Sequence, residues 1–593
     1  MPVYAAPLRE YSFLLRDVLQ IDRYANLPGF ADAPMDVVDQ ILEEGAKFCE
    51  GVLQPLNVVG DREGCRRHAD GSVTTPTGFK DAYKQMVEGG WPSLASDPNY
   101  GGQGLPRIVN LAFNEMVSSA NMAFGMYPGL SHGAYEAILH HGSQALKDTY
   151  LPNMVTGAWT GTMNLTEPHC GTDLGLLRTK AVPQADGSYR ISGQKIFISA
   201  GEHDLADNII HLVIARIEGA PAGTKGISLF IVPKFLVNAD GSLGERNKVV
   251  CGKIEEKMGI HGNATCVLNY DEAVGYLCGE ANRGLNAMFT MMNEARLGVG
   301  LQGLAQAEAA YQNGRAYAKD RLQGRSLTGP KNPDGPADPL IVHPDVRRML
   351  LDAKCFIEGA RAFAFWTALY GDLQTLSPDE ALRTKAGDYM ALMTPVLKSY
   401  LTDYGYKTAT DCQQIYGGHG FIEEWGMSQF VRDARITMIY EGANGVQALD
   451  LVGRKLMQNG GRPLQTFLAE LDEFVAANEG DASLKAYVDG VRGAKDQLQD
   501  GTMWLMQNAM ANPDNAGAAS HDYLNLFGLT ALAYMWALMA KVALAKKGSD
   551  PFYETKLATA NYFFARKLPE TGAHLAKLKS GAGPLMALEA SAF

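Results

Sequence analysis

The sequence predicts a mainly helical protein with a small β-domain in the middle of the chain. Apolar residues recur at helical spacing in residues 35–49 and through most of residues 280–458. Between these stretches, residues 160–275 contain short runs rich in β-branched and aromatic residues, separated by turn sequences such as the ADGS motifs at 185–188 and 239–242. With 593 residues the chain is also too long for a single hydrophobic core, so we expect several domains.

The pattern divides the chain into five segments. They are an N-terminal extension (1–35), a helical domain (36–158), a β-domain (159–278), a second helical domain (279–458) and an additional helical domain (459–593). Strands of the β-domain are expected at 189–191, 195–198, 209–215, 227–232 and 266–270.

Composition and charge exclude some classes of protein. The chain has 53 Lys and Arg against 65 Asp and Glu, and its net charge of −12 argues against nucleic acid as a partner, because phosphate binding needs a basic face. The eight cysteines include no C-x-x-C pair, so we expect reduced thiols and no metal site. The first residues, MPVYAAPLREYSF, lack a basic stretch followed by an apolar core, and we expect a cytoplasmic protein.

One uncharged apolar run, LFGLTALAYMWALMA at 526–540, could belong to a membrane span or to a buried helix. A bilayer span needs about 20 residues, and this run is shorter. We therefore expect a buried bundle helix, with contact with a membrane surface as the alternative.

Two short motifs resemble known chemistry but lack its structural context. Gly298, Gly300 and Gly303 match G-x-G-x-x-G, yet the residues on both sides read as helix, so close helix packing is expected instead of a nucleotide loop. Ser131 lies in a G-x-S-x-G sequence, but no strand is expected before it, as a serine hydrolase requires. A hydrolase acting through Ser131 is the competing class of enzyme, and a non-catalytic binding role is the third.

Three segments carry the chemistry that the sequence favours. They are TEPHCGTD (166–173), SGQKIFISAG (192–201) and IYEGANGVQ (439–447). A flavin gathers negative charge at N1 and O2 when it is reduced, and preorganised donors stabilise that charge best. Thr166 offers a hydroxyl, residues 167–172 offer backbone N–H groups, and residues 197–199 offer an aromatic face and a second hydroxyl.

These segments resemble conserved motifs of the acyl-CoA dehydrogenase family. TEPHCGTD is similar to TEPxxGSD, SGQKIFISAG to NGxKxWITN, and QIYGGHGF…FVRDARITMIYEG to QxxGGxGx…RDxxxxxIYEG. The order and spacing of the motifs agree over about residues 36–455. The length and the helical tail resemble the large bacterial branch of this family, which includes enzymes for 3-methylthiopropanoyl-CoA and for medium- or long-chain acyl-CoA.

The resemblance implies a fold and a cofactor. The fold is an N-terminal helical domain, a middle β-barrel and a C-terminal four-helix bundle, here with an additional C-terminal helical domain. FAD would lie between the β-domain and the bundle, and the adjacent subunit would complete its site.

The resemblance also assigns residues to the site. It places FAD beside Met163, Leu165, Thr166, Gly171, Thr172, Phe197, Ile198, Ser199, Arg321, His343, Gln414, Gly417, Gly418, Ala443 and Gly445. It places the acyl-CoA beside Ser131, Thr172, Asn293, Arg296, Tyr440 and Gly442.

The chain departs from the family pattern at several of these positions. Phe197 replaces a tryptophan, Ser199 a threonine and Thr172 a serine, and these changes keep the chemistry. Other departures fall near the adenosine or the CoA, at Gly324, Pro344, Ala443 and Ala448.

The implied reaction is the α,β-dehydrogenation of a saturated acyl-CoA to the trans-2-enoyl-CoA. The thioester α-proton becomes removable when the carbonyl oxygen is stabilised as it gains charge, and in the family the backbone N–H of the base helps to do this. Glu441 is the expected base, in an apolar pocket that raises its pKa, and flavin N5 accepts the hydride. Glu294, near Arg296, is the alternative base because some members place theirs on that helix.

The partners follow from the same resemblance. Electron-transfer flavoprotein is the expected acceptor, and an acyl-CoA oxidase that uses oxygen is the alternative. The additional helical domain would cover the surface through which smaller members form tetramers, so we expect a homodimer. The type of acyl chain stays open.

Overall fold

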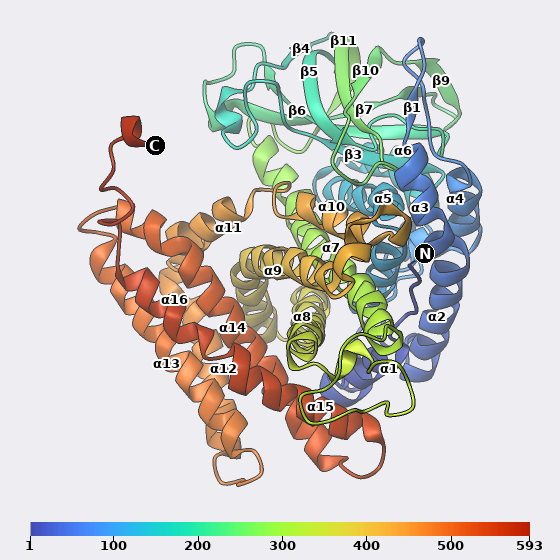
Figure 1. Ribbon diagram of the computed structural model, residues 1–593. Coiled ribbons are helices and arrows are strands. Elements are labelled where there is room, and N and C mark those ends of the chain that lie inside the picture. The colour runs from blue at the N-terminus through green and yellow to red at the C-terminus, as the bar shows by residue number, and fades with distance from the viewer. Residues whose placement is uncertain (1) are drawn as a thin grey trace. The chain divides into compact units, whose positions relative to one another are not determined.

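The computed structural model describes residues 2–593, which divide into two compact units (Figure 1). The first unit joins the residues up to Glu43 with Val299–Phe593, and the second is Glu44–Gly298. The divisions fall within helices α2 (Met35–Phe48) and α7 (Gly284–Asp320). The N-terminal extension therefore groups with the helical C-terminal half of the chain.

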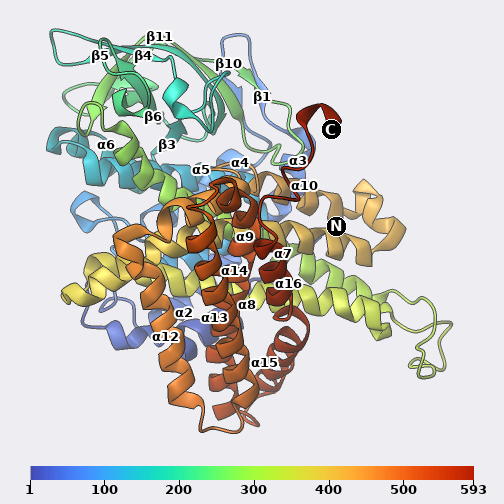
Figure 2. The ribbon, with the colours of Figure 1, turned by 90° about the vertical axis from the view of Figure 1, so that its left-hand side faces the viewer.

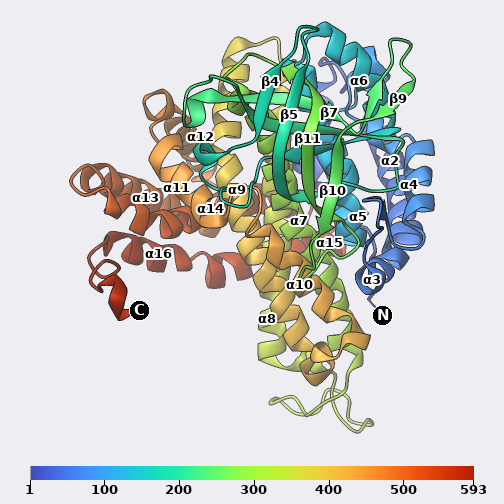
Figure 3. The ribbon, with the colours of Figure 1, turned by 90° about the horizontal axis from the view of Figure 1, so that it is seen from above.

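The second unit is built on a seven-stranded sheet, counted over residues 2–593. Its strands are β3 (Trp159–Asn164), β4 (Lys180–Pro183), β5 (Tyr189–Ser199), β6 (Asn208–Ile217), β7 (Ile227–Pro233), β10 (Val249–Ile254) and β11 (Thr265–Cys278). β11 pairs with β5, β5 with β4, β4 with β6, β6 with β7 and β7 with β11, so these strands close a ring. β10 adds to β11 (Figure 3), and β3 adds to β6.

The predicted β-domain is confirmed, with differences in detail. The two runs expected at 189–191 and 195–198 form one continuous strand, β5, and the structure adds β3, β4 and β10. β3 was missed because its residues, WTGTMN, show no alternation of polar and apolar side chains: almost all are buried. One side of β3 packs against helix α5 (Arg107–His141).

Helix α5 is broken near its middle. Asn121 has φ −159° and ψ 90°, and its side-chain oxygen accepts a hydrogen bond from the N–H of Phe124 at 3.1 Å. Asn121 therefore caps the second half of the helix, which contains Ser131. The other helices of this unit are α3 (Gln54–Glu63), α4 (Phe79–Glu88) and α6 (Gln144–Thr156).

The first unit is helical. Its bundle contains α7, α8 (Pro344–Leu376), α9 (Glu380–Ile415) and α10 (Met427–Thr437), followed by the short α11 (Asn444–Asp450). The additional C-terminal helices are α12 (Arg462–Asn478), α13 (Lys485–Asn508), α14 (Asp514–Ala545), α15 (Pro551–Tyr562) and α16 (Glu570–Lys579), seen in orange to red in Figure 2.

Helix α14 contains the apolar run at 526–540. Among the described residues it is the one helix long and apolar enough to cross a membrane, and 83% of its most apolar stretch is buried within the protein. It packs against α13, α15 and α16 and also against α8, α9 and α11. The prediction of a buried core helix is confirmed.

The glycines of the G-x-G-x-x-G sequence lie inside α7, where they permit a close crossing with α9. A Cβ atom at Gly303 would stand 2.7 Å from the carbonyl oxygen of Leu401 and 2.8 Å from Cα of Thr402, both on α9. Because these neighbours are backbone atoms, they have no freedom to move aside. Gly300 and Gly303 therefore serve helix packing, as the sequence predicted, whereas a Cβ at Gly298 would meet nothing within 4 Å.

The N-terminal segment is part of the first unit. Tyr11 on α1 (Leu8–Ser12) stacks on Phe365 of α8 with ring centroids 5.6 Å apart. The buried Lys556 of α15 donates to Glu10 at 2.5 Å and to Glu358 at 2.6 Å. These contacts tie the start of the chain to the bundle and to the additional C-terminal helices.

Candidate active site

The end of β5 forms an exposed wall in strained backbone. Phe197 has φ +58° and its ring is 61% exposed, and Ala200 has φ +54°. A non-glycine residue in the left-handed region costs free energy, and such residues cluster at functional sites. An exposed aromatic ring held in this way, next to the half-buried hydroxyl of Ser199, fits a planar aromatic ligand such as a flavin.

A buried ion pair fixes the neighbouring TEPHCGTD segment to this wall. Lys195, on β5, donates from Nζ to Glu167 Oε1 at 2.9 Å and to the carbonyl oxygen of Leu165 at 2.9 Å. Glu167 also accepts from the backbone N–H groups of Arg178 and Thr179 and from the Thr179 hydroxyl, at 2.5–3.0 Å. Burial alone would raise the pKa of Glu167, but these partners outweigh burial and lower it.

The anchored segment places Thr166 beside β5. The N–H of Ile196 donates to the carbonyl oxygen of Thr166 at 2.9 Å. Glu167 and Cys170 exchange backbone hydrogen bonds of 2.8 and 3.0 Å, which closes the loop between them. The structure thus brings Thr166 next to the strand that carries Phe197.

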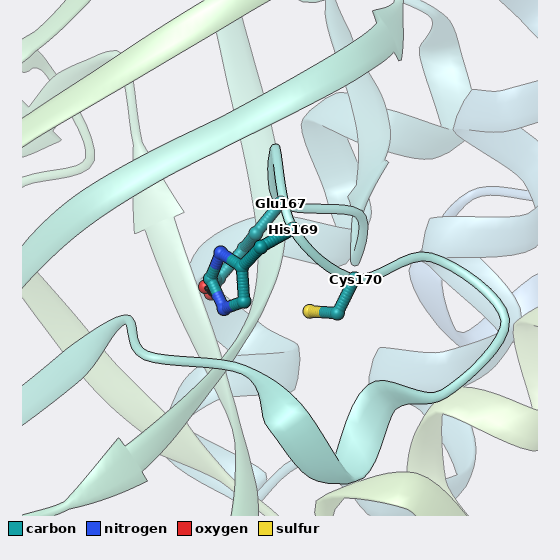
Figure 4. Close-up of side chains that lie close together, drawn as sticks. All are labelled: Glu167, His169 and Cys170. Atoms are coloured by element: carbon teal, nitrogen blue, oxygen red, sulfur yellow. Dashed lines mark ion pairs between the residues drawn. The ribbon is translucent and has the colours of Figure 1, made fainter.

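The same loop contains three groups that could be read as metal ligands. Donor atoms of Glu167, His169 and Cys170 lie within 4.8 Å of one another (Figure 4). Both carboxylate oxygens of Glu167 are already used as acceptors, and the ammonium of Lys195 at 2.9 Å would repel a cation. We therefore interpret the cluster as a structural element that fixes the loop.

Glu441 lies in the first unit, in a turn between α10 and α11. It is half-buried, with φ +58°, and Gly442 follows with φ +85°. Gln447 Nε2 donates to the carbonyl oxygens of both residues at 3.2 Å. Lys398 Nζ donates to the carbonyl oxygen of Gly442 at 2.9 Å. The predicted base therefore has strained backbone, and its turn is firmly held.

Tyr440 precedes the base and is fixed by its hydroxyl. That hydroxyl donates to the side-chain oxygen of Gln302 on α7, and burial raises the pKa of Tyr440. Tyr440 therefore stays neutral at physiological pH and supports the turn.

The predicted site residues fall in both units, and each unit groups its own set. The second unit holds Ser131, Met163, Leu165, Thr166, Gly171, Thr172, Phe197, Ile198, Ser199, Asn293 and Arg296. The first unit holds Arg321, His343, Gln414, Gly417, Gly418, Tyr440, Glu441, Gly442, Ala443 and Gly445.

The predicted site residues of the second unit differ in how far their side chains are exposed. Gly171 and Thr172 are exposed on the anchored loop, whereas Ile198 is buried and points away from the exposed face of Phe197 along the strand. In the first unit, Arg321 and Gln414 are exposed, as phosphate and nucleoside contacts would need.

His343 is engaged in its own loop. Its Nε2 lies 2.8 Å from the carbonyl oxygen of Gln323, and a Cβ at Gly324 would stand 3.4 Å from its ring. Gly324, which departs from the family pattern, therefore leaves room for this imidazole.

The hydrolase interpretation of Ser131 is wrong. Ser131 lies inside α5 and is not at a turn between a strand and a helix. Its hydroxyl donates to the carbonyl oxygen of Tyr127 at 2.7 Å and accepts from the N–H of Gly161 at 3.0 Å. The hydroxyl thus joins α5 to β3, and its buried position gives it no nucleophilic role.

Glu294, the alternative base, has a cationic partner. Arg107 donates to Glu294 at 2.5 Å and to the buried Glu136 at 2.8 Å. The Glu294 carboxylate is thus engaged by a guanidinium of its own unit. This pairing favours Glu441 over Glu294.

Two lysines in these units were not singled out from the sequence. Lys195 lies within SGQKIFISAG but was read only as part of the motif. Lys398 has no exposed surface, and its neighbours Val396, Leu397 and Leu401 are buried too. The sequence signal that could have identified Lys398 is a lysine inside an apolar helical run. Such a side chain is buried only when it is well paired.

Comparison with known protein families matches most of the chain. Family models match residues 39–158 (acyl-CoA dehydrogenase, N-terminal domain), 162–273 (middle domain), 282–457 (C-terminal domain) and 467–589 (acetyl-CoA dehydrogenase C-terminal like). The chain belongs to the acyl-CoA dehydrogenase family.

Individual relatives extend over the whole chain. The 3-methylmercaptopropionyl-CoA dehydrogenase of Ruegeria pomeroyi is 42% identical, covering 97% of this chain and 98% of the relative. A broad-specificity linear acyl-CoA dehydrogenase of Mycobacterium tuberculosis is 34% identical over 100% of both chains. The acyl-CoA dehydrogenase of Bacillus anthracis, solved with FAD, shares the fold with a TM-score of 0.74 at 23% identity, covering 94% of this chain and 89% of its own.

The predicted fold class and enzyme class are confirmed. The protein is an FAD-dependent oxidoreductase that dehydrogenates acyl-CoA.

Proposed function

We propose that Glu441 is the base that removes the α-proton of a saturated acyl-CoA thioester. The observation that carries this proposal is the strained turn: Glu441 is held at φ +58° by bonds from Gln447 and Lys398 to the turn's carbonyl oxygens. Such strain persists only where the surroundings over-determine it, and it is typical of residues whose direction matters.

The chain's residues divide the work of the reaction. The Glu441 carboxylate takes the α-proton, and the backbone N–H of Glu441 stabilises the thioester oxygen as charge grows there. Gly442 has no side chain, which leaves room beside the carboxylate. FAD, when bound, supplies the acceptor for the β-hydrogen, which leaves as hydride.

We propose that the wall at the end of β5 holds the flavin ring. Phe197 offers an exposed aromatic face, and the hydroxyls of Thr166 and Ser199 offer hydrogen bonds to the ring edge. The loop with Gly171 and Thr172 offers backbone N–H groups. Residues for the pyrophosphate and adenosine, from this chain or a second copy, are Arg321, His343, Gln414, Gly417, Gly418, Ala443 and Gly445.

The CoA arm has fewer assigned residues. We propose Asn293 and Arg296 near the start of α7 as its contacts. Ala448, which replaces an arginine of many family members, is 1% exposed, so the substitution packs α11 and gives no CoA contact from this position.

We infer that the acyl chain is short and linear, either a thioether or an aliphatic chain. The support comes from named relatives: the one at 42% identity is named for 3-methylmercaptopropionyl-CoA, and a butyryl-CoA dehydrogenase of Syntrophomonas wolfei is 34% identical over 95% of each chain. We further propose electron-transfer flavoprotein as the acceptor, a homodimer, and a cytoplasmic location. The relatives' names as dehydrogenases support that acceptor over oxygen.

An anaerobic titration tests the proposed function. The purified protein is expected to be yellow, and its flavin absorbance is followed during addition of 3-methylthiopropanoyl-, butanoyl-, octanoyl- and palmitoyl-CoA. Bleaching by the first two at stoichiometric amounts supports the substrate class. Bleaching by palmitoyl-CoA alone would contradict it, and a colourless protein that FAD does not restore would overturn the whole proposal.

A further inference from the structure

Lys398 is a fully buried lysine that bonds the turn of the proposed base. It lies in α9 with 0% of its surface exposed. Burying an ammonium group is costly unless strong acceptors surround it. Its Nζ donates to the carbonyl oxygen of Gly442 at 2.9 Å and to Asn444 Oδ1 at 2.8 Å. Both acceptors lie within three residues of Glu441, so the ammonium group bonds the turn that carries the base.

Asn444 connects the same turn to α9 a second time. Its Nδ2 donates to Asp403 Oδ1 at 2.7 Å and to Thr402 Oγ1 at 2.9 Å. Its backbone N–H donates to the carbonyl oxygen of Met438 at 3.1 Å, which closes the turn around Glu441. The turn is thus bound to one helix through both its backbone and a buried amide side chain.

The helix that supplies Lys398 is itself fixed in place. Gly303 of α7 touches α9 at Leu401 and Thr402, one helical turn beyond Lys398. That contact has no slack, because a single added Cβ would clash with backbone atoms. A displacement of Lys398 relative to Gly442 is therefore resisted by the packing of two long helices.

The turn needs such support because it is strained twice. Glu441 and Gly442 both have positive φ, and Glu441 has a Cβ that makes this conformation unfavourable. Without a donor behind Gly442, its carbonyl oxygen would be buried beside α9 with only the longer 3.2 Å bond from Gln447. The loss of Lys398 would favour relaxation of Glu441 to an ordinary backbone conformation.

We propose that Lys398 is a positioning residue for the base. Its ammonium holds the Gly442 peptide and Asn444, and so aims the carboxylate and the backbone N–H of Glu441 at the substrate thioester. The inference rests on the proposed role of Glu441 and deepens it. Lys398 does not exchange a proton with the substrate; it acts only through the turn.

The test measures proton removal separately from hydride transfer. Methylthioacetyl-CoA has sulfur in place of the β-carbon, so it can lose an α-proton but has no β-hydrogen to give. Its α-hydrogens exchange with D2O on the enzyme, and mass spectrometry counts the deuterium. Lys398→Met, which keeps the length of the side chain and removes the charge, is expected to retain FAD and bind the analogue while exchange slows about 100-fold.

A matched variant separates positioning from general stability. Lys556→Met removes another fully buried ammonium of the same unit, one that bonds Glu10 and Glu358 instead of the catalytic turn. It is expected to unfold at lower urea concentration than wild type and to exchange at the wild-type rate. Ethylammonium added to Lys398→Ala is expected to restore exchange in proportion to its concentration, which a purely structural role would not produce.

The outcomes distinguish this inference from the proposed function. Wild-type exchange in Lys398→Met, with exchange abolished in Glu441→Gln, would overturn the role of Lys398 alone. Normal exchange in Glu441→Gln would overturn the base assignment itself. If Lys398→Met does not fold, Asn444→Ala takes its place: it removes one acceptor of Lys398 and is expected to slow exchange about tenfold.

Discussion

The buried ion pair between Lys195 and Glu167 offers the sharpest test of the flavin wall. Lys195→Met keeps the apolar stem and removes the ammonium that lies 2.9 Å from both Glu167 Oε1 and the carbonyl oxygen of Leu165. Removing one partner of a buried pair costs about 3–5 kcal/mol of folding free energy. Three other donors to Glu167 remain, so we expect the lower end, about 3 kcal/mol.

The same change should weaken FAD binding, because the segment that carries Thr166 loses its side-chain bonds to β5 and keeps the backbone bond from Ile196. We expect the Kd for FAD to rise about 10- to 100-fold, which corresponds to about 1.4–2.8 kcal/mol. Urea unfolding of the flavin-free protein gives the stability change, and quenching of FAD fluorescence during titration gives the Kd.

Asn247→Ala is the matched control for this experiment. Its amide donates to the carbonyl oxygens of Pro233 and Val274 at 2.9 Å, so its loss also destabilises the β-domain. Val274 pairs with Arg190, at the opposite end of β5 from Ser199. The control should lose stability and keep its FAD affinity. If Lys195→Met also kept the wild-type Kd while losing stability, the ion pair would serve the fold alone and our account of the wall would be refuted.

Three further predictions concern other parts of the chain. Gly303→Ala should cost about 1–3 kcal/mol in urea unfolding, because the added Cβ meets the backbone of Leu401 at 2.7 Å; an unchanged midpoint would show that the helices separate easily. Burial favours a high pKa for Glu136, but Arg107 and two histidines lower that pKa from 4.5 to about 2. The contribution of the ionised Glu136 to folding stability is therefore complete above pH 4.5 and is lost as the pH falls through 2. Glu136→Gln should therefore lower stability at pH 7 by about 3 kcal/mol and flatten its decline between these pH values, whereas a parallel acid titration would argue against the pairing. Ser131→Ala should keep flavin reduction by acyl-CoA close to the wild-type rate, and a complete loss with FAD still bound would return Ser131 to the active site.

Much of the fold could be predicted from the sequence where a periodic pattern and a physical requirement coincide. The run at 526–540 is uncharged along its whole length, and it is buried on all sides in α14. The glycines at 300 and 303 lie in a helical pattern, and they permit the contact with α9 that they were expected to permit. In both cases a local feature of the sequence was enough to favour the observed packing.

The parts that were missed depend on contacts distant in sequence. β3 has no alternation because both of its faces are covered, one of them by α5. Lys398 is separated from Gly442 by 44 residues, and only the packed structure shows that they meet. The motif residues Thr166, Phe197 and Glu441 were found through their resemblance to a family. The bonds that hold the Thr166 segment and the Glu441 turn come from Lys195 and Lys398, which only the packed structure shows.

The Glu441 carboxylate is proposed to remove the substrate α-proton, and a comparison of wild type with Glu441→Gln tests this step. Wild type and Glu441→Gln are loaded with FAD, mixed anaerobically with excess 3-methylthiopropanoyl-CoA, and followed at the flavin absorbance maximum. We expect the wild-type flavin to bleach rapidly, and we expect Glu441→Gln to bind the ligand and stay yellow. Bleaching of Glu441→Gln at the wild-type rate would show that another group takes the proton.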